Sequence, residues 1–222
     1  YEIPKRDWSS DVCSSDLFCI TDNEAAIKAS KDEIVRRYYN SLVDVRFAKE
    51  SYSCVEKIQT LMSNLDISSE DRKVALAARE KEEITGKESF AIELDDGRIM
   101  KGKKSKLFTA PAACILNALK KLGNLDDEIL LLSPHIIEPV SKLKTNSLGE
   151  TEPSLSINEM LIALAISATT NPLTHMAMEE IKNLKSLDAH STVILNDSEK
   201  RMLRKLGINF TQDPVFGEDS GY

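Results

Sequence analysis

Residues 192–210, TVILNDSEKRMLRKLGINF, contain two short apolar runs with an amphipathic segment between them. Thr192–Leu195 and Ile208–Phe210 are rich in β-branched and apolar residues, which predicts two strands. Asp197–Leu206 predicts a helix, and Gly207 follows it at the position where helices favour a left-handed residue. Two strands separated by a helix favour a parallel pair with the helix packed on its face.

A similar unit precedes it in the chain. Apolar residues alternate over 90–94, the turn sequence Asp95-Asp96-Gly97 follows, and Ile99 resumes the alternation, which predicts a β-hairpin. Pro111–Leu122 predicts a helix, and the apolar run Ile129–Leu132 predicts a strand.

Two more helices are predicted between these units. Ser156 and Glu159 have the spacing of a capping box, and Pro172 after Asn171 is typical of a helix start. The pattern indicates a helix-rich α/β fold. An N-terminal helical segment precedes strand-helix-strand units that form a small, mainly parallel or mixed sheet.

The first third of the chain predicts helices alone. Residues 21–24, Thr-Asp-Asn-Glu, read as a capping box, and a helix beginning at Ser69 should stop at Gly86. Apolar residues return to one face of the first helix at Ile27, Ile34, Tyr38, Leu42 and Val45. We therefore divide the chain into a helical segment, a mixed α/β segment and a frayed tail, at residues 18–86, 87–214 and 215–222.

The opening segment Tyr1–Leu17 has no hydrophobic periodicity. Read back into codons, it resembles a translated sequencing adapter, and a disordered polar leader is the alternative. Either origin removes the segment from the fold, so we expect no function for Trp8 or Cys13.

Composition excludes several classes of protein. The formal net charge is −7, which argues against a nucleic-acid partner because phosphate binding needs a concentrated basic surface. No apolar run is long enough to predict a membrane-spanning helix. Outside the opening segment, the cysteines are odd in number and lack close C-x-x-C spacing, so we expect reduced thiols in a cytoplasmic protein.

His190 is the candidate catalytic residue, and Ser191 and Thr192 are candidate ligand-binding residues. A histidine beside two hydroxyls could bind a phosphate or orient an acid. In the alternative, the hydroxyls satisfy backbone groups at a strand and His190 is packed or hydrogen-bonded. Sequence alone shows no partner base or nucleophile, so both interpretations stay open.

Other functional motifs are absent from the sequence. No phosphate loop of the form Gly-x4-Gly-Lys-Ser/Thr occurs, so we expect no cofactor in this chain. His175 lacks the second histidine that a zinc-protease helix requires, so we expect no metal. Arg36 and Arg37 should pair with Asp32 or Glu33 one turn earlier rather than bind nucleic acid.

Five stretches together resemble one bacterial family of unknown function, DUF1846, also called UPF0371. They are FCITDNEAAIKASKDEIVRRYY, EDRKVALAAREK, SINEMLIALAISATTNP, DAHSTVIL and RKLGINFTQDP. The resemblance implies that this chain is the C-terminal part of a longer protein, whose upstream half resembles a nucleotide-hydrolase domain with a glycine-rich loop. A nucleotide is therefore a possible cofactor of the full-length protein. The stretch Glu152–Ser156 departs from the family pattern, which has an arginine and a histidine there, and this puts a ligand role for that loop in doubt.

These observations lead to two hypotheses of function. We favour a docking and oligomerisation module whose partners are the missing N-terminal half and further copies of itself. The alternative is that His190 and its neighbours complete the active site of a nucleotide-dependent enzyme. The sequence does not decide whether the protein is an enzyme.

Overall fold

The computed structural model describes residues 22–217. The segment Tyr1–Leu17, Thr21 and the end of the predicted tail lie outside the described residues. Asp22 caps the first helix, since its Oδ1 accepts a hydrogen bond from Ala25 N. The helix start is therefore confirmed, with Asp22 as the capping residue.

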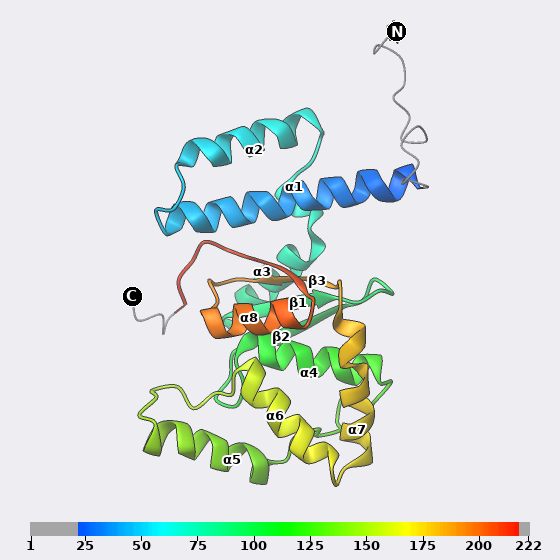
Figure 1. Ribbon diagram of the computed structural model, residues 1–222, viewed down its shortest axis with the longest axis vertical. Helices are drawn as coiled ribbons and strands as arrows, with labels where there is room; N and C mark the ends of the chain where they lie inside the picture. Colours follow the sequence, from blue (N-terminus) through cyan, green and yellow to red (C-terminus); the bar gives the residue numbers. More distant parts are fainter. Residues whose placement is uncertain (1–21, 218–222) are drawn as a thin grey trace, which may run out of the picture.

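The structure is helix-rich and contains one four-stranded sheet (Figure 1). The N-terminal elements are α1 Asn23–Arg46, α2 Tyr52–Asn64, the 3-10 turn η2 Ser69–Asp71 and α3 Lys73–Thr85. The strands are β1 Ser89–Glu93, β2 Ile99–Lys103, β3 Asp188–Ser191 and β4 Asn209–Gln212. The remaining elements are α4 Ala110–Leu122, α5 Pro134–Lys142, η3 Leu143–Ser147, α6 Ile157–Ala168, α7 Pro172–Glu179, η4 Glu180–Leu184 and α8 Asp197–Lys205.

The sheet is mixed, with strand order β2-β1-β3-β4. The hairpin β1–β2 is antiparallel, β1 also pairs antiparallel with β3, and β3 pairs parallel with β4. Strands β2, β3 and β4 therefore run in the same direction and end at one edge of the sheet. The predicted hairpin is confirmed, and so is a parallel strand-helix-strand unit, although its first strand is β3 Asp188–Ser191 and not the predicted Thr192–Leu195.

Helices cover both faces of the sheet. Helix α3 packs on β1, β2 and β3, and α1 contacts β4, with α2 lying on α1 away from the sheet (Figure 1). Helix α4 packs on β1 and β2 and contributes to a large core shared with α6, α7 and α8. A smaller, separate core joins α1, α2 and the first turn of α3 through Val35, Tyr39, Met62, Ile67 and Ala75.

Two predicted strands are wrong. Residues 129–132 form no strand, although Leu131 and Leu132 are buried in the main core. Residues 192–195 follow β3 and form no strand. Thr192 N still donates to Ser89 O at the start of β1, and Ile194 forms an isolated bridge with Phe216. Apolar composition correctly indicated burial in both runs. A strand also needs an adjacent strand whose backbone N–H and C=O groups are available for pairing.

The predicted helix starts and ends that have clear capping signals are confirmed. Helix α6 has the Ser156–Glu159 capping box, and α7 begins at Pro172 with Asn171 as its cap. Gly86 and Gly207 are left-handed residues that end α3 and α8. No helix among residues 22–217 is long and apolar enough to cross a membrane.

Candidate functional site

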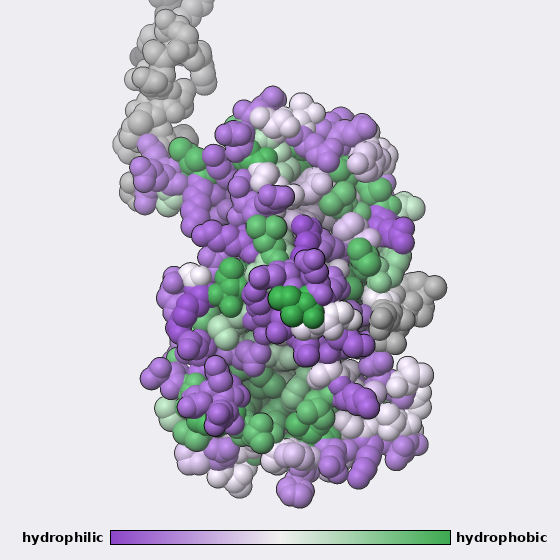
Figure 2. Space-filling model, turned by 180° about the vertical axis from the view of Figure 1, so that it is seen from behind, coloured by the Kyte–Doolittle hydropathy of each residue, from purple (hydrophilic) through white to green (hydrophobic). Residues whose placement is uncertain are grey.

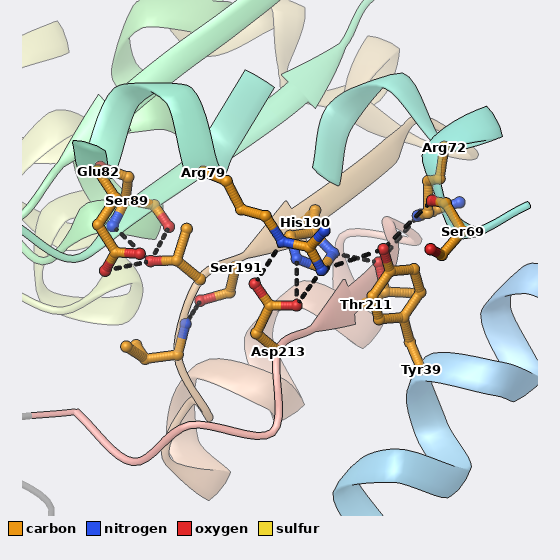
Figure 3. Close-up of polar contacts among 12 residues, drawn as sticks. Tyr39, Ser69, Arg72, Arg79, Glu82, Ser89, His190, Ser191, Thr211 and Asp213 are labelled. Carbon is orange, nitrogen blue, oxygen red and sulfur yellow. Dashed lines mark hydrogen bonds and ion pairs between the residues drawn. The ribbon is translucent and has the colours of Figure 1, made fainter. Parts of the chain in front are cut away.

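His190 lies at the centre of the sheet and is completely buried. Its neighbours in the sheet are Ala91 of β1 and Thr211 of β4. The ring of Tyr39, from α1, packs edge-on against the imidazole with 4.9 Å between the ring centroids. Figure 3 shows that the histidine is enclosed by side chains from α1, α3 and β4.

A chain of polar contacts runs through the imidazole (Figure 3). Arg72 Nε donates to Thr211 Oγ1 at 2.8 Å, and Thr211 Oγ1 lies 2.8 Å from His190 Nδ1. His190 Nε2 lies 3.4 Å from Asp213 Oδ1, which is an ion-pair distance but falls short of a well-aligned hydrogen bond. A hydrogen on Nε2 faces the carboxylate favourably, so we assign the Nε2–H tautomer, with Thr211 donating to Nδ1.

Asp213 connects the histidine to helix α3. Arg79 forms a two-pronged ion pair with it, from Nε to Oδ2 at 2.9 Å and from Nη2 to Oδ1 at 2.5 Å. Arg79 Nη2 also donates to the hydroxyl of Tyr39, and that hydroxyl donates to Ser69 O. The contacts therefore join α1, η2, α3, β3 and the segment after β4.

Arg72 lies at the other end of this chain of polar contacts, beyond Thr211. Its guanidinium is buried and donates to the carbonyl oxygens of Ala189 and Asn209, in the two parallel strands. An ion pair with Asp188 Oδ1 at 3.1 Å balances part of its charge. Burial lowers the pKa of Arg72, and Asp188 acts in the opposite direction.

The electrostatics favour a neutral histidine beside an ionised aspartate. Burial lowers the pKa of His190 and outweighs the opposing effect of Asp213, and the positive charges of Arg79 and Arg72 add to the decrease. Burial would raise the pKa of Asp213, but the hydrogen bonds from Arg79 and the nearby imidazole of His190 outweigh it and hold the pKa at about 2. We name the group Tyr39, Arg72, Arg79, His190, Thr211 and Asp213 the His190 cluster.

The three predicted site residues do not share one pocket. Thr192 Oγ1 donates to Glu82 Oε1 at 3.0 Å and accepts from Ser89 N. Ser191 Oγ accepts from Val193 N at 3.4 Å. Both hydroxyls contact backbone groups, as the structural alternative predicts, and their role in ligand binding stays a prediction.

Sequence reasoning missed the partners of His190. Tyr39 and Arg79 come from helices α1 and α3, and Arg72 immediately precedes α3; all three are far from His190 in the sequence and carry no local signal. Thr211 and Asp213 are two residues apart, so an extended backbone puts them on one side of β4, the side that faces His190. Thr211 and Asp213 could have been predicted as partners of His190 if the parallel pairing of β3 with β4 had been known.

A separate cleft of about 710 Å³ lies at the edge where β2, β3 and β4 end. The first residues of α4, α6 and α8 line it, together with the loop from Val193 to Asn196. Its charged residues are Glu88, Lys104, Lys144, Glu150, Glu152, Glu159 and Glu199. Ligands of α/β proteins commonly bind beyond the carboxyl ends of strands, so this cleft is the second candidate site.

Glu199 is the most deeply buried carboxyl group of the cleft, with 4% of its surface exposed. Thr109, which precedes α4, donates to its Oε1 at 2.5 Å. Burial raises the pKa of Glu199, and the charges of Glu88 and Glu159 add to the increase. The hydrogen bond from Thr109 and the charge of Lys144 oppose this rise.

The structure provides no metal-binding group among the described residues 22–217. His175 lies on the surface, 4.0 Å from Glu179, one turn later on α7. Arg36 and Arg37 both pair with Glu33, one of the two predicted partners.

Comparison with known proteins identifies the family. The model described as "Domain of unknown function DUF1846, C-terminal" matches residues 70–222. The chain belongs to the DUF1846 family. The N-terminal DUF1846 model matches residues 12–66, so the two models divide the chain between α2 and η2. The N-terminal match includes residues 12–17, and the interpretation of that segment as a leader stays a prediction.

Relatives in the DUF1846 family are considerably longer than this chain. UPF0371 proteins of Streptococcus pneumoniae strains CGSP14 and JJA are 50% identical over 205 residues. A third, from strain Hungary19A-6, is 49% identical over the same length. The aligned region is 92% of this chain and 42% of each relative.

Proposed function

We propose that the chain is a docking module, in which the α1–α2 helix pair binds the part of the longer DUF1846 polypeptide that this chain does not match. The observation that carries the proposal is the division of the family models. Helices α1 and α2 fall within the match to the N-terminal model, whereas the sheet falls within the C-terminal one. The helix pair therefore belongs by sequence to a domain of which little else is present.

The packing of the helix pair supports this proposal. The α1–α2 core contains five buried hydrophobic residues, far fewer than the main core. The outer surface of α2 retains exposed apolar side chains, with Leu61 and Leu65 one turn apart and more than 40% exposed. Figure 2 shows apolar residues interrupting the polar surface of this upper layer. A helix pair with a small core and an apolar outer surface gains stability from a further partner.

The His190 cluster supports the same role. It fixes α1 to the sheet through Tyr39, Arg79 and Asp213, so the helix pair is held in a defined orientation. A buried polar network of this kind orients elements because each donor requires its own acceptor. The completely buried His190 offers no accessible group to a substrate, so no observation favours the enzymatic alternative at this position.

The proposal is tested by mixing this chain with the unmatched part of a pneumococcal relative and measuring complex formation by size-exclusion chromatography. We expect a one-to-one complex, and we expect the double variant L61E/L65E to abolish it. The matched control is I162E/I166E on α6, which also places two charges on exposed apolar residues one turn apart. Binding by the α2 variant, or no complex with the unaltered chain, would refute docking through α2.

Homo-oligomerisation is the second half of the proposal. With its partner absent, the apolar surface of α2 should bind further copies of the chain. Light scattering at increasing concentration should show self-association that L61E/L65E reduces. A monomer at every concentration would contradict it.

A further inference from the structure

The imidazole of His190 lies where helix α1 packs against the sheet. Tyr39 of α1 covers the imidazole with its ring, and both side chains are almost completely buried (Figure 3). His190 Nε2 has no hydrogen-bond partner within the described residues 22–217. Because α1 supplies part of this cover, the surroundings of the imidazole depend on whether α1 stays in place.

A second proton on this imidazole would be poorly stabilised. In the Nε2–H tautomer the unprotonated nitrogen is Nδ1, which lies 2.8 Å from Thr211 Oγ1, an oxygen that already accepts from Arg72 Nε. The resulting cation would lie close to the guanidinium groups of Arg72 and Arg79. Asp213, the carboxylate that faces the ring, is already paired with Arg79. Burial and like charge therefore disfavour the protonated form while α1 is in place.

Helix α1 is held by few contacts near the imidazole. The α1–α2 core is small and separate from the main core. The hydroxyl of Tyr39 makes long hydrogen bonds, at 3.2 Å to Ser69 O and at 3.3 Å from Arg79 Nη2. Regions with few buried apolar contacts open locally at lower free energy than the whole protein. Movement of α1 would withdraw the Tyr39 ring and admit water to the imidazole.

We propose that His190 is a proton-sensitive switch, in which protonation of the imidazole releases the α1–α2 helix pair from the sheet. The open arrangement binds the proton more strongly than the closed one, because the imidazole is then solvated. Protons therefore shift the equilibrium toward the open arrangement. The switch concerns how α1 is held and does not depend on what α2 binds.

His190 is the group of the cluster that titrates near neutral pH. The groups that face it are Tyr39 of α1, Arg72 before α3, Arg79 of α3, Asp213 after β4 and the uncharged Ala91 of β1. Asp213 stays ionised, because against the effect of burial Arg79 holds its pKa at about 2. Burial raises the pKa of Tyr39 above its ordinary value, and arginine side chains stay protonated. A response near neutral pH would therefore report the imidazole.

Opening of α1 should become easier as pH falls. Burial lowers the pKa of His190 in the closed arrangement against the opposing effect of Asp213, and solvation returns it toward the ordinary value in the open one. Opening is therefore insensitive to pH well above 7 and becomes easier below it, until the closed arrangement also binds the proton. One proton whose pKa in the open state is about 6.5 raises the opening constant by up to about tenfold between pH 7.5 and pH 5.5.

The test uses the double variant H135N/H175N, which leaves His190 as the one histidine of the chain. Both replaced residues are exposed, so the fold should be kept. Hydrogen exchange followed by mass spectrometry, corrected for the intrinsic exchange rate, should show protection in α1 and α2 falling severalfold, up to tenfold, between pH 7.5 and pH 5.5. The imidazole resonances should titrate below pH 6.5. Unchanged protection in α1 and α2 would overturn the proposal, as would an imidazole that titrates at or above pH 6.5.

Two further variants assign the response to His190. His190→Asn removes the proton site and should make the protection of α1 and α2 independent of pH in this range. Glu82→Gln is the control, because it removes a nearby carboxyl group whose pKa is raised by burial, and it should leave the fall in protection unchanged. A fall that persists in His190→Asn or disappears in Glu82→Gln would refute the assignment. Loss of protection in α4 without a loss in α1 and α2 would mean that protons favour global unfolding alone, and the switch would be wrong. If His190→Asn does not fold, the double variant still decides.

Discussion

At the scale of single residues, Asp213 is the group on which the His190 cluster depends. It is largely buried and contacts both Arg79 and His190. Without its negative charge, the guanidinium of Arg79 and the Nε2–H of His190 would lose their shared acceptor. Residues that satisfy several donors at once are more sensitive to substitution than their number of contacts suggests.

Asp213→Asn should lower the free energy of unfolding by about 2 kcal/mol, the typical value of hydrogen bonds to a charged group. Chemical denaturation measures the change. Asp127→Asn, at an exposed position in the loop after α4, is the control and should change stability by less than about 0.5 kcal/mol. Equal stability of the two variants would show that the ion pair contributes nothing.

His190 should make stability dependent on pH. Its pKa in the folded protein lies below the ordinary value of 6.5, so the unfolded chain binds its proton more readily. The free energy of unfolding therefore falls as pH drops below about 7, toward the folded pKa. The depressed pKa of Asp213 adds a separate loss between about pH 4 and pH 2, as its carboxylate takes up a proton.

His190→Asn should flatten the difference in stability between pH 7 and pH 5. Denaturant titrations at each pH give the comparison, with His175→Asn as the control because His175 is exposed on α7. A profile for His190→Asn that parallels that of the unaltered chain would contradict a buried, neutral imidazole.

At the scale of elements, the predicted and observed faces of α1 differ by one residue. The sequence places Tyr38 and Ile34 on the buried stripe, but the fully buried residues are Val35, Tyr39 and Val43. Tyr38 and Ile34 are partly buried against the α1–α2 core. The helix contacts both α2 and β4, so two adjacent stripes are buried, and a single stripe read from the sequence could describe just one of them.

The packing of α4 on β2 depends on a single glycine. A Cβ at Gly102 would clash with the backbone of Cys114 and lie 2.6 Å from Ala110 O, so the helix could not approach the strand as closely. Gly102→Ala should destabilise the protein by about 1–3 kcal/mol through overpacking. Gly123→Ala, just after α4, is the control, because its Cβ would meet its nearest atom at 3.3 Å. Equal melting temperatures for the two variants would refute the close approach.

At the scale of the whole molecule, the main hydrophobic core and the α1–α2 core are of unequal size, and a third small cluster lies between α3 and β1. The larger one contains β1, β3, α4, α6 and α8, and the smaller one holds α2 against α1. Regions with few buried apolar contacts open at lower free energy than the rest of a protein. The helix pair should therefore exchange its amide hydrogens faster than α4.

Substitutions in the main core and in the α1–α2 core should have different effects on hydrogen exchange in the two regions. Met62→Ala should increase hydrogen exchange in α1 and α2 and leave α4 protected, whereas Leu119→Ala should reduce protection everywhere by about 2–5 kcal/mol. Hydrogen exchange followed by mass spectrometry resolves both regions. A uniform response to Met62→Ala would mean that the molecule unfolds as a single unit.

The sequence by itself determined the elements whose signals are local. The capping box at Ser156, the left-handed glycines after α3 and α8, and the turn at Asp95-Asp96-Gly97 all depend on residues a few positions apart. Each supplies hydrogen bonds or backbone angles that no distant residue needs to complete. The helix-rich α/β class and the burial of apolar runs followed from the same local patterns.

The tertiary structure alone decided which apolar runs became strands and what surrounds His190. A strand needs a neighbour with free backbone groups, and residues 129–132 have none, whereas Asp188–Ser191 lies between β1 and β4. The same pairing brings Thr211 and Asp213 to the histidine, while α1 and α3 bring Tyr39, Arg72 and Arg79. These contacts join residues far apart in the chain, and their geometry exists only after the sheet and helices have packed.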